Sequence, residues 1–292
     1  MLAGGHIAPW GVMNYRHAFH AGNFADVVKH AALVRILVHL RAKPAAFRVI
    51  DTHAGAGCYD LAGPEAGRSQ EWREGIQRLA AAPVVPAAAA LLAPYLDAVA
   101  TMNPAGALTV YPGSPALAQA LLRPQDRLTA CELEPGAAAA LVRCLGGDRR
   151  SKAIAIDGWT ALRAYVPPKE RRGVVLVDPS FEEADDFPRL AQALETAHRK
   201  WASGIFLLWY PIKERGGPDA LARRLRRSGI AKILRAELSV RRDPGRLAAC
   251  GLVVVNPPWT LERELRVLLP ALTGVLSDGG GGHRVEWLSG ES

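Results

Sequence analysis

The stretch of sequence that decides the fold is residues 49–57, which read V-I-D-T-H-A-G-A-G. A short apolar run ends at Asp51, and Gly55 and Gly57 follow closely after it. Glycine lets the chain turn tightly and approach a ligand without a Cβ atom in the way. A dinucleotide-binding turn would place a third glycine at position 60, where this chain has Asp60. Taken alone, the stretch also fits an ordinary turn between a strand and a helix, but it disfavours a nicotinamide site.

Seven short apolar runs of this kind recur along the chain, separated by helical patterns. They are residues 47–51, 128–131, 153–156, 173–177, 205–209, 233–240 and 252–255. Strands that alternate with helices are typical of a doubly wound, mostly parallel α/β sheet of the Rossmann-like class. Ligands of such sheets bind at the carboxyl ends of the strands, near the point where the strand order reverses. We therefore expect functional side chains directly after the strands.

The residues that end four successive strands fit one ligand. The glycine-rich turn follows the first strand, Glu132 ends the second, Asp157-Gly158 ends the third and Asp178-Pro179 ends the fourth. Glu132 can accept hydrogen bonds from both hydroxyls of a ribose, and Asp157 can accept one from the amino group of an adenine. Each acid on its own fits a surface carboxylate. The ordered set predicts a pocket for S-adenosylmethionine in a seven-stranded class I methyltransferase sheet.

The segment after the fourth strand, D-P-S-F at 178–181, is close to the pattern [D/N]-P-P-[Y/F/W] of amino-methyltransferases. An exocyclic amine reacts poorly because its lone pair is delocalised into the ring, so a site must accept its hydrogens and hold the base. Asp178 and the carbonyl of Pro179 can accept these hydrogen bonds, and Phe181 can stack on the base. Ser180 replaces the second proline, which leaves a catalytically weak RNA-binding protein as an alternative.

The segment N-P-P-W at 256–259 fits the same pattern more closely. In a class I methyltransferase the fourth strand lies beside the first, so Asp178 should emerge next to the glycine-rich turn. The last strand runs antiparallel to its neighbours, which sends its end to the opposite edge of the sheet. We therefore predict that Asp178 belongs to the active site and that N-P-P-W is structural.

A polar segment precedes a predicted helix near the N-terminus. Asn23 and Asp26 resemble a helix cap, and apolar residues then repeat at helical spacing. His17, His20 and His30 could ligate zinc together with Asp26, but their spacing matches no common zinc site and no thiolate accompanies them. We therefore predict no metal site.

The gap between the first and second predicted strands is longer than a simple crossover needs. It contains a helical, alanine-rich run at 87–100, so we expect residues 60–108 to form a small helical insertion. The methyltransferase domain then comprises residues 14–59 and 109–292. Residues 1–13 would form an N-terminal extension, which we expect to be flexible.

The composition, with 49% hydrophobic and 22% charged residues, excludes a wholly disordered chain. The net charge of +8 favours a polyanionic partner, although arginine runs such as 223–227 also occur on solvated faces. The longest uncharged run, residues 79–96, contains prolines and predicts no membrane span. The four cysteines include no CxxC pair, so they predict neither a zinc site nor a disulfide scaffold, and with no visible signal peptide they favour the cytoplasm.

Several longer motifs together resemble one known family, the J-type 23S ribosomal RNA adenine-N6 methyltransferases. They are Y-R-H-A-F-H-A-G-N at 15–23, D-V-V-K-H at 26–30, D-T-H-A-G-A-G at 51–57, Y-P-G-S-P at 111–115, D-G at 157–158, L-W-Y-P at 208–211 and N-P-P-W at 256–259. The similarity runs from about residue 14 to the C-terminus, and its opening polar segment is its most specific part. The family's usual D-P-P-Y is changed here at Ser180 and Phe181.

The resemblance implies a methyltransferase fold with a small helical insertion, and roles for particular residues. The methyl donor would lie against His30, His53, Ser114, Glu132, Asp157, Gly158 and Asp178, around the turn at Gly55 and Gly57. Catalysis would rest on Asp178, Pro179 and Phe181, and the target base would be held by Tyr15, His17, Lys29 and Phe181.

The predicted function is therefore S-adenosylmethionine-dependent methylation of the exocyclic amine of one adenine in 23S ribosomal RNA. The partner is the RNA, with no membrane and no metal, and a monomer is the favoured form, although the sequence does not define the oligomeric state. A DNA adenine-N6 methyltransferase remains an alternative, because the pocket alone does not tell ribose from deoxyribose.

Overall fold

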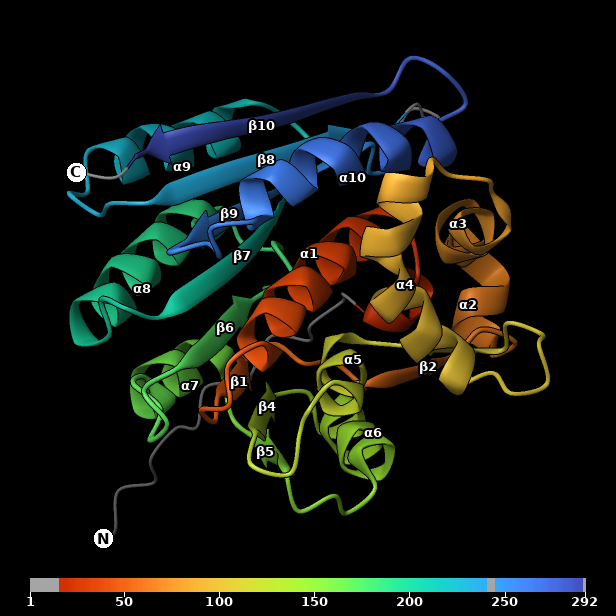
Figure 1. The fold of residues 1–292 in the computed structure, drawn as a ribbon, viewed down its shortest axis with the longest axis horizontal. Helices are drawn as coiled ribbons and strands as arrows, with labels where there is room; N and C mark the ends of the chain where they lie inside the picture. The colour runs from red at the N-terminus through yellow and green to blue at the C-terminus, as the bar shows by residue number, and fades with distance from the viewer. Residues whose placement is uncertain (1–15, 241–244, 291–292) are drawn as a thin grey trace, which may run out of the picture.

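The computed structural model describes residues 16–240 and 245–290 of the chain, so the predicted extension at 1–13 lies outside the described residues. An eight-stranded sheet runs through the molecule in the order β10-β8-β9-β7-β6-β1-β4-β5 (Figure 1). Its strands are β1 (Arg48–Asp51), β4 (Arg127–Glu132), β5 (Ser151–Ala155), β6 (Gly173–Val177), β7 (Ile205–Pro211), β8 (Ile233–Ser239), β9 (Ala249–Val255) and β10 (Gly282–Ser289).

The centre of the sheet is parallel. β1 pairs with β4 on one side and β6 on the other, and β5 and β7 extend the sheet in the same direction. β9 runs antiparallel to both β7 and β8. The doubly wound, mostly parallel sheet is confirmed, and the strand order reverses between β1 and β6, whose carboxyl ends therefore form the expected ligand-binding edge.

The sheet has one strand more than the seven predicted from the sequence. β10 pairs antiparallel with β8, in a segment for which the sequence predicts no strand. Of its residues only Leu288 is buried. The strand is held by backbone pairing rather than by a buried face, so its sequence lacks the alternating apolar pattern that identifies inner strands.

A second, two-stranded sheet joins β2 (Cys58–Asp60) to β3 (Val110–Pro112). Between these strands the chain forms α2 (Pro64–Ser69), the π-helix η2 (Arg73–Gln77), α3 (Arg78–Ala81) and α4 (Pro86–Thr101). These helices gather on one side of the molecule, beside α1 (Figure 1). Within the described residues no single helix is long and apolar enough to span a membrane. The helical segments Arg73–Ala81 and Pro86–Thr101 are long and apolar enough only when taken together, and they are bent by 119° relative to each other.

Helices cover both faces of the main sheet and create two apolar cores. Val174 and Leu176 of β6 face the first core, whereas Val175 and Val177 face the second, as the alternation of a strand requires. The first core is formed with α1 (Phe24–Arg41), α4, α5 (Ser114–Ala120), α6 (Pro135–Leu145) and α10 (Leu261–Leu276). The second is formed with α7 (Gly158–Tyr165), α8 (Asp186–Lys200) and α9 (Gly216–Arg226).

Helix α1 is buried on almost every side. Asn23 caps it, because its Oδ1 accepts hydrogen bonds from the backbone N–H groups of Ala25 and Asp26, as the sequence predicts. The sequence suggests a single apolar stripe, but neighbouring elements enclose the whole first half of the helix, including the charged residues Asp26 and Lys29. Charged groups in such a position require partners, since an unpaired buried charge is very costly.

The structure corrects the prediction that the cysteines form no disulfide. Cys58 and Cys144 are joined by a disulfide, and Cys131 and Cys250 are buried free thiols. Cys58 begins β2 directly after the glycine-rich turn, and Cys144 lies in the last turn of α6, 86 residues later. The two meet only because β2 folds back against α6, so their spacing in the sequence contains no sign of the pairing.

Candidate active site

The carboxyl ends of β1 and β6 carry a cluster of buried charges. Lys29 of α1 donates from Nζ to Oδ2 of Asp178, directly after β6, over 2.5 Å, and lies 2.8 Å from Oδ1 of Asp26. His17, in the 3-10 helix η1 (His17–Phe19), lies 3.0 Å from Oδ2 of Asp26 through its Nε2. We call Asp26, Lys29 and Asp178 the ion cluster; it joins two residues that are 149 positions apart.

The charges of the ion cluster support one another. Burial alone would lower the pKa of Lys29, but the carboxylates of Asp178 and Asp26 outweigh it and raise that pKa well above its usual range. Burial would also raise the pKa of Asp26, which the nearby His17, Lys29 and His30 instead hold well below its usual value. Lys29 is therefore a permanent cation. Oδ1 of Asp178 accepts no hydrogen bond from the described residues, so this oxygen is available to a ligand.

His30 follows Lys29 on α1 and is fully enclosed. Its Nδ1 lies 2.6 Å from the hydroxyl of Tyr111, which is 2.8 Å from the hydroxyl of Tyr95. Burial lowers the pKa of His30 to about 3, so the ring is neutral near neutral pH. Its Nε2 has no hydrogen-bond partner among the described residues.

Asp51 ends β1 and is also buried. Ser114, the first residue of α5, donates its hydroxyl to Oδ2 of Asp51 over 2.6 Å. Burial raises the pKa of Asp51 to about 7, and its Oδ1 has no hydrogen-bond partner within the described part of the chain. The family resemblance predicted that Ser114 binds the methyl donor but did not include Asp51, although the place of Asp51 at the start of the glycine-rich turn was a usable signal.

The glycine-rich turn is held by its neighbours. The backbone N–H of Gly55 donates to Oε2 of Glu132 over 2.8 Å, which connects the ends of β1 and β4. Gly55 has a φ of +62°, and a Cβ atom on it would lie 2.2 Å from the hydroxyl of Tyr59. A side chain at Gly55 is therefore excluded both by backbone conformation and by space. Gly57, as predicted, belongs to the same turn and has a φ of +80°.

The third strand end approaches the same turn. A Cβ atom on Gly158 would lie 2.4 Å from the carbonyl oxygen of Thr52 and 2.5 Å from Nε2 of His53, so only glycine permits this contact. Asp157 caps α7, because its Oδ2 accepts from the N–H and the hydroxyl of Thr160. Burial lowers the pKa of His53 to about 4, and its Nδ1 lies 2.8 Å from the hydroxyl of Thr52.

The segment after Asp178 turns sharply. Pro179 is buried, and Phe181 has a φ of +53°, a left-handed conformation that is strained for a bulky residue. The Phe181 ring packs against Phe187 and Trp209, with centroid distances of 4.9 and 5.9 Å. These contacts hold the half-buried ring in place beside the end of β6, and the strain is a cost of the kind that clusters at functional sites.

The competing motif lies at the other edge of the sheet. Asn256 follows β9, and its side-chain amide donates to the carbonyl oxygens of Ala202 and Gly204 over 2.7 and 2.8 Å. Ala202 and Gly204 precede β7, so this contact lies at the amino edge, opposite Asp178. Trp259 of the same motif is 81% exposed. The topological reason for choosing Asp178 over Asn256 therefore agrees with the strand directions of the structure.

The fold brings nearly all the predicted site residues to one edge of the sheet. The strand ends and turns described above carry His53, Gly55, Gly57, Glu132, Asp157, Gly158 and Asp178, whereas His30 lies on α1 and Ser114 begins α5. Lys29 and His17 are joined to them through the ion cluster. Tyr15 lies outside the described residues. The sequence did not reveal that Tyr111 holds His30, because this contact joins separate segments. Asp26 and Lys29 are one turn apart on α1, so their pairing had a usable signal that was overlooked.

The residues of this edge fit S-adenosylmethionine. Two enclosed polar atoms, His30 Nε2 and Asp51 Oδ1, have no hydrogen-bond partner among the described residues, and buried atoms of this kind are nearly always hydrogen-bonded. An amino-acid ammonium group can donate to a carboxylate such as Asp51, and ribose hydroxyls can donate to Glu132. Gly55 and Gly158 let the turns pack directly against Tyr59, Thr52 and His53, where any side chain would collide, which keeps the strand ends close together.

The sheet order, the glycine-rich turn and the acidic strand ends define a class I methyltransferase, which takes its methyl group from S-adenosylmethionine. Within this class, the chain belongs to the family described as ribosomal RNA large subunit methyltransferase D, RlmJ, whose sequence profile matches residues 44–289. The family resemblance predicted from the sequence motifs is confirmed.

Two relatives are named ribosomal RNA large subunit methyltransferase J. The one from Haemophilus influenzae is 39% identical over 284 residues, which cover 96% of this chain and 100% of the relative. The one from Escherichia coli is 39% identical over 280 residues, covering 95% and 99%. The crystal structure of protein LPL1258 from Legionella pneumophila is 32% identical, covers 91% of this chain and 98% of its own, and superposes with a TM-score of 0.83.

Proposed function

We propose that this enzyme transfers a methyl group from S-adenosylmethionine to the exocyclic N6 amine of one adenine in 23S ribosomal RNA. The observation that carries this proposal is the position of Asp178. It lies where the strand order reverses, beside the glycine-rich turn, with one carboxylate oxygen bound to Lys29 and the other available. The names of the two relatives support ribosomal RNA as the substrate class.

The chain's own residues would hold the amine for reaction. Asp178 Oδ1 and the carbonyl of Pro179 would accept hydrogen bonds from the two amine hydrogens, which leaves more electron density on the nitrogen. Lys29 would keep the Asp178 carboxylate oriented through its 2.5 Å contact. When bound, S-adenosylmethionine supplies an electrophilic methyl group on a positively charged sulfur. Positioning and electrostatics would account for most of the rate enhancement.

The target base needs an aromatic surface and must leave its own stack. Phe181 would supply that surface, since its ring is only half buried and is fixed by Phe187 and Trp209. Stacking on an aromatic ring offsets part of the cost of unstacking a base, which is on the order of a few kcal/mol. We further propose that His17, Lys29 and Tyr15 border the place of the base.

The remaining predictions follow from the same proposal. An enzyme that methylates large-subunit ribosomal RNA acts in the compartment where that RNA is made, so we propose that this enzyme is cytoplasmic. We also propose that residues 60–108 form a helical insertion in the methyltransferase domain, which consists of residues 14–59 and 109–292. Whether the chain acts as a monomer is open to direct measurement by light scattering.

Transfer of a labelled methyl group to a panel of acceptors tests the proposal. The panel comprises protein-free 23S ribosomal RNA, assembled large subunits and DNA of the same sequence. We expect methylation of the RNA or of the subunit, with the label recovered as N6-methyladenine by nucleoside mass spectrometry. Preferential methylation of DNA would favour the alternative substrate. Donor and RNA binding without any transfer would instead show that Ser180 marks a catalytically weak member of the family.

A further inference from the structure

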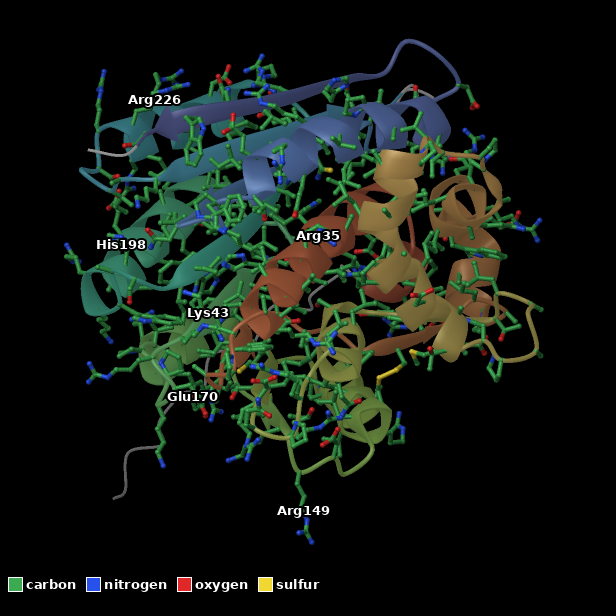
Figure 2. The ribbon with its side chains drawn as sticks, in the orientation of Figure 1. Arg35, Lys43, Arg149, Glu170, His198 and Arg226 are labelled. Carbon is green, nitrogen blue, oxygen red and sulfur yellow. A yellow bond between two sulfur atoms is a disulfide. The ribbon has the colours of Figure 1, made fainter. Side chains whose placement is uncertain are left out.

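A cavity of about 750 Å³ opens between the C-terminal ends of α8 and α9. Its lining includes Glu195, His198 and Arg199 of α8, together with Arg223, Arg224 and Arg227 at the end of α9. We call it the α8–α9 groove. Figure 2 shows His198 and Arg226 on this side of the molecule, over α8 and α9. None of the residues predicted to form the active site lines it.

The groove lies at the edge of the sheet opposite Asp178. Helix α8 begins soon after the carboxyl end of β6 and runs back to the start of β7, and α9 likewise runs back to the start of β8. Because β7 and β8 both run parallel to β6, the C-terminal ends of these helices lie at the amino edge. A helix of 15 residues such as α8 is about 22 Å long. The groove is therefore separated from the catalytic edge by about the length of a helix.

The groove carries an excess of positive charge. Among the described residues that line the groove, Glu195 is the one carboxylate. Arg224 donates two hydrogen bonds of 2.8 Å to it and neutralises its charge. Arg199, Arg223 and Arg227 are exposed and form no ion pair with other described residues. Burial lowers the pKa of His198, so the charge near neutral pH comes from the arginines.

These arginines are placed for an extended anion. Arg223 lies in the last turn of α9 and Arg227 follows as its C-cap, so the two guanidinium groups come from positions about one helical turn apart. A guanidinium offers several donors in a planar fork that matches phosphate oxygens. The charges here are exposed and spread over two helices rather than directed into a closed pocket. This arrangement suits several phosphates of a polymer better than one enclosed ion.

We propose that the α8–α9 groove binds the phosphodiester backbone of the RNA substrate at a distance from the target nucleotide. The inference rests on the proposed function, since it assumes that the substrate is a ribosomal RNA. Contacts to phosphates set the position of an RNA without reading its sequence. An RNA long enough to reach both edges would use the groove, whereas a short fragment around the target adenine would not.

The test compares two charge-matched triple variants. The first, Arg199→Gln with Arg223→Gln and Arg227→Gln, removes the groove charges. The control, Arg143→Gln with Arg149→Gln and Arg263→Gln, removes three exposed arginines that lie on α6, on the loop before β5 and on α10. Both have the same net charge, so general electrostatic attraction to RNA is reduced equally. Thermal unfolding verifies that each variant is folded.

RNA affinity is measured by fluorescence anisotropy with a long domain of 23S RNA and with a short fragment around the methylated adenine, over a range of salt concentrations. For the groove variant we expect the long RNA to bind at least about tenfold more weakly. The slope of log affinity against log salt concentration should fall in magnitude by about 2, as the loss of two or three phosphate contacts implies. Binding of the short fragment and its methylation should match the control.

Equal affinity of the two triple variants for the long RNA would overturn the groove proposal. So would equal weakening for the short and long RNA, because the groove would then not be a remote site. These outcomes are independent of the proposed function, which is tested separately by methyl transfer from the unaltered enzyme to RNA and DNA acceptors.

Discussion

Two proline motifs of similar sequence lie at opposite edges of one sheet and do different things. Asp178-Pro179-Ser180-Phe181 follows a parallel strand and presents a carboxylate to Lys29 and the glycine-rich turn. Asn256-Pro257-Pro258-Trp259 follows an antiparallel strand, and its amide holds the loop before β7. Each contains a residue other than glycine with a left-handed φ, Phe181 at +53° and Asn256 at +51°.

The difference shows that the direction of the preceding strand decides the role of such a motif. Asn256 uses its side chain to satisfy backbone carbonyls, which stabilises the fold. The catalytic edge does the opposite, because Asp51 and His30 each keep a buried polar atom with no hydrogen-bond partner in the described part of the chain, and Phe181 has a strained backbone. Those features lower the stability of the free protein in return for a prepared site.

The strongest test of this contrast is Asp178→Asn. The amide cannot offer a second carboxylate oxygen to the amine, so we expect methyl transfer to fall by about 10³-fold, equal to about 4 kcal/mol in the barrier. Single-turnover transfer to 23S ribosomal RNA measures the effect. Nearly full activity in this variant would move the catalytic role away from Asp178.

Lys29→Met should have the largest effect on stability. It removes the cation between two carboxylates that are mostly enclosed, with side-chain exposures of 2% for Asp26 and 13% for Asp178. Breaking a buried ion pair in this way costs about 3 kcal/mol or more. Urea unfolding measures the loss, and adding Asp178→Asn to the same chain should recover part of it. A stability loss below about 1 kcal/mol would mean that the ion cluster is well solvated.

Asp51→Asn should stabilise the free protein in a pH-dependent manner. Burial raises the pKa of Asp51 from 3.8 to about 7, so the folded state retains a proton that the unfolded chain loses. The native chain therefore loses stability as the pH rises from about 4 to about 7, whereas the variant has no such loss. We expect a gain of about 2 kcal/mol at pH 8 and little at pH 4.

Urea unfolding of both proteins at pH 4, 6 and 8 tests this expectation. A gain of equal size at all three values would show that Asp51 is not the titrating group. The variant should also bind S-adenosylmethionine more weakly at pH 8, because its amide lacks the charge that would face the donor's ammonium group. Titration calorimetry measures that difference.

The smallest effect is expected for Asn256→Ala. Loss of the two hydrogen bonds to Ala202 and Gly204 should destabilise the protein by about 1–2 kcal/mol. Methyl transfer by the folded variant should be unchanged, in contrast to Asp178→Asn. A reduction of tenfold or more in transfer rate, without a change in fold, would contradict the structural role of this motif.

Much of this fold could be predicted because its signals are local. The seven apolar runs became strands, and the cap at Asn23 starts α1 as expected. β10 was missed because an edge strand with only Leu288 buried has no apolar pattern. The Cys58–Cys144 disulfide was missed because it depends on how β2 meets α6.

The candidate site divides in the same way. Gly55, Glu132, Asp157 and Asp178 were predictable because parallel strands place their carboxyl ends on one edge, so order along the chain becomes proximity in space. Asp51 was overlooked although it lies within the motif that decides the fold. That Tyr111 holds His30 could not be predicted, since no regular spacing relates these two positions. The pairing of Asp26 with Lys29 was overlooked, although the two stand at the i,i+3 spacing of a helix.

The sequence by itself determined the class of this protein, because strand periodicity, glycine turns and acidic strand ends are properties of short segments. Only the tertiary structure decided which charges pair and which proline motif faces the glycine-rich turn. The contact of Lys29 with Asp178 spans 149 positions and exists because β6 lies beside β1 and the buried first half of α1 packs against this edge. Such a contact depends on strand order and packing, which no single segment contains.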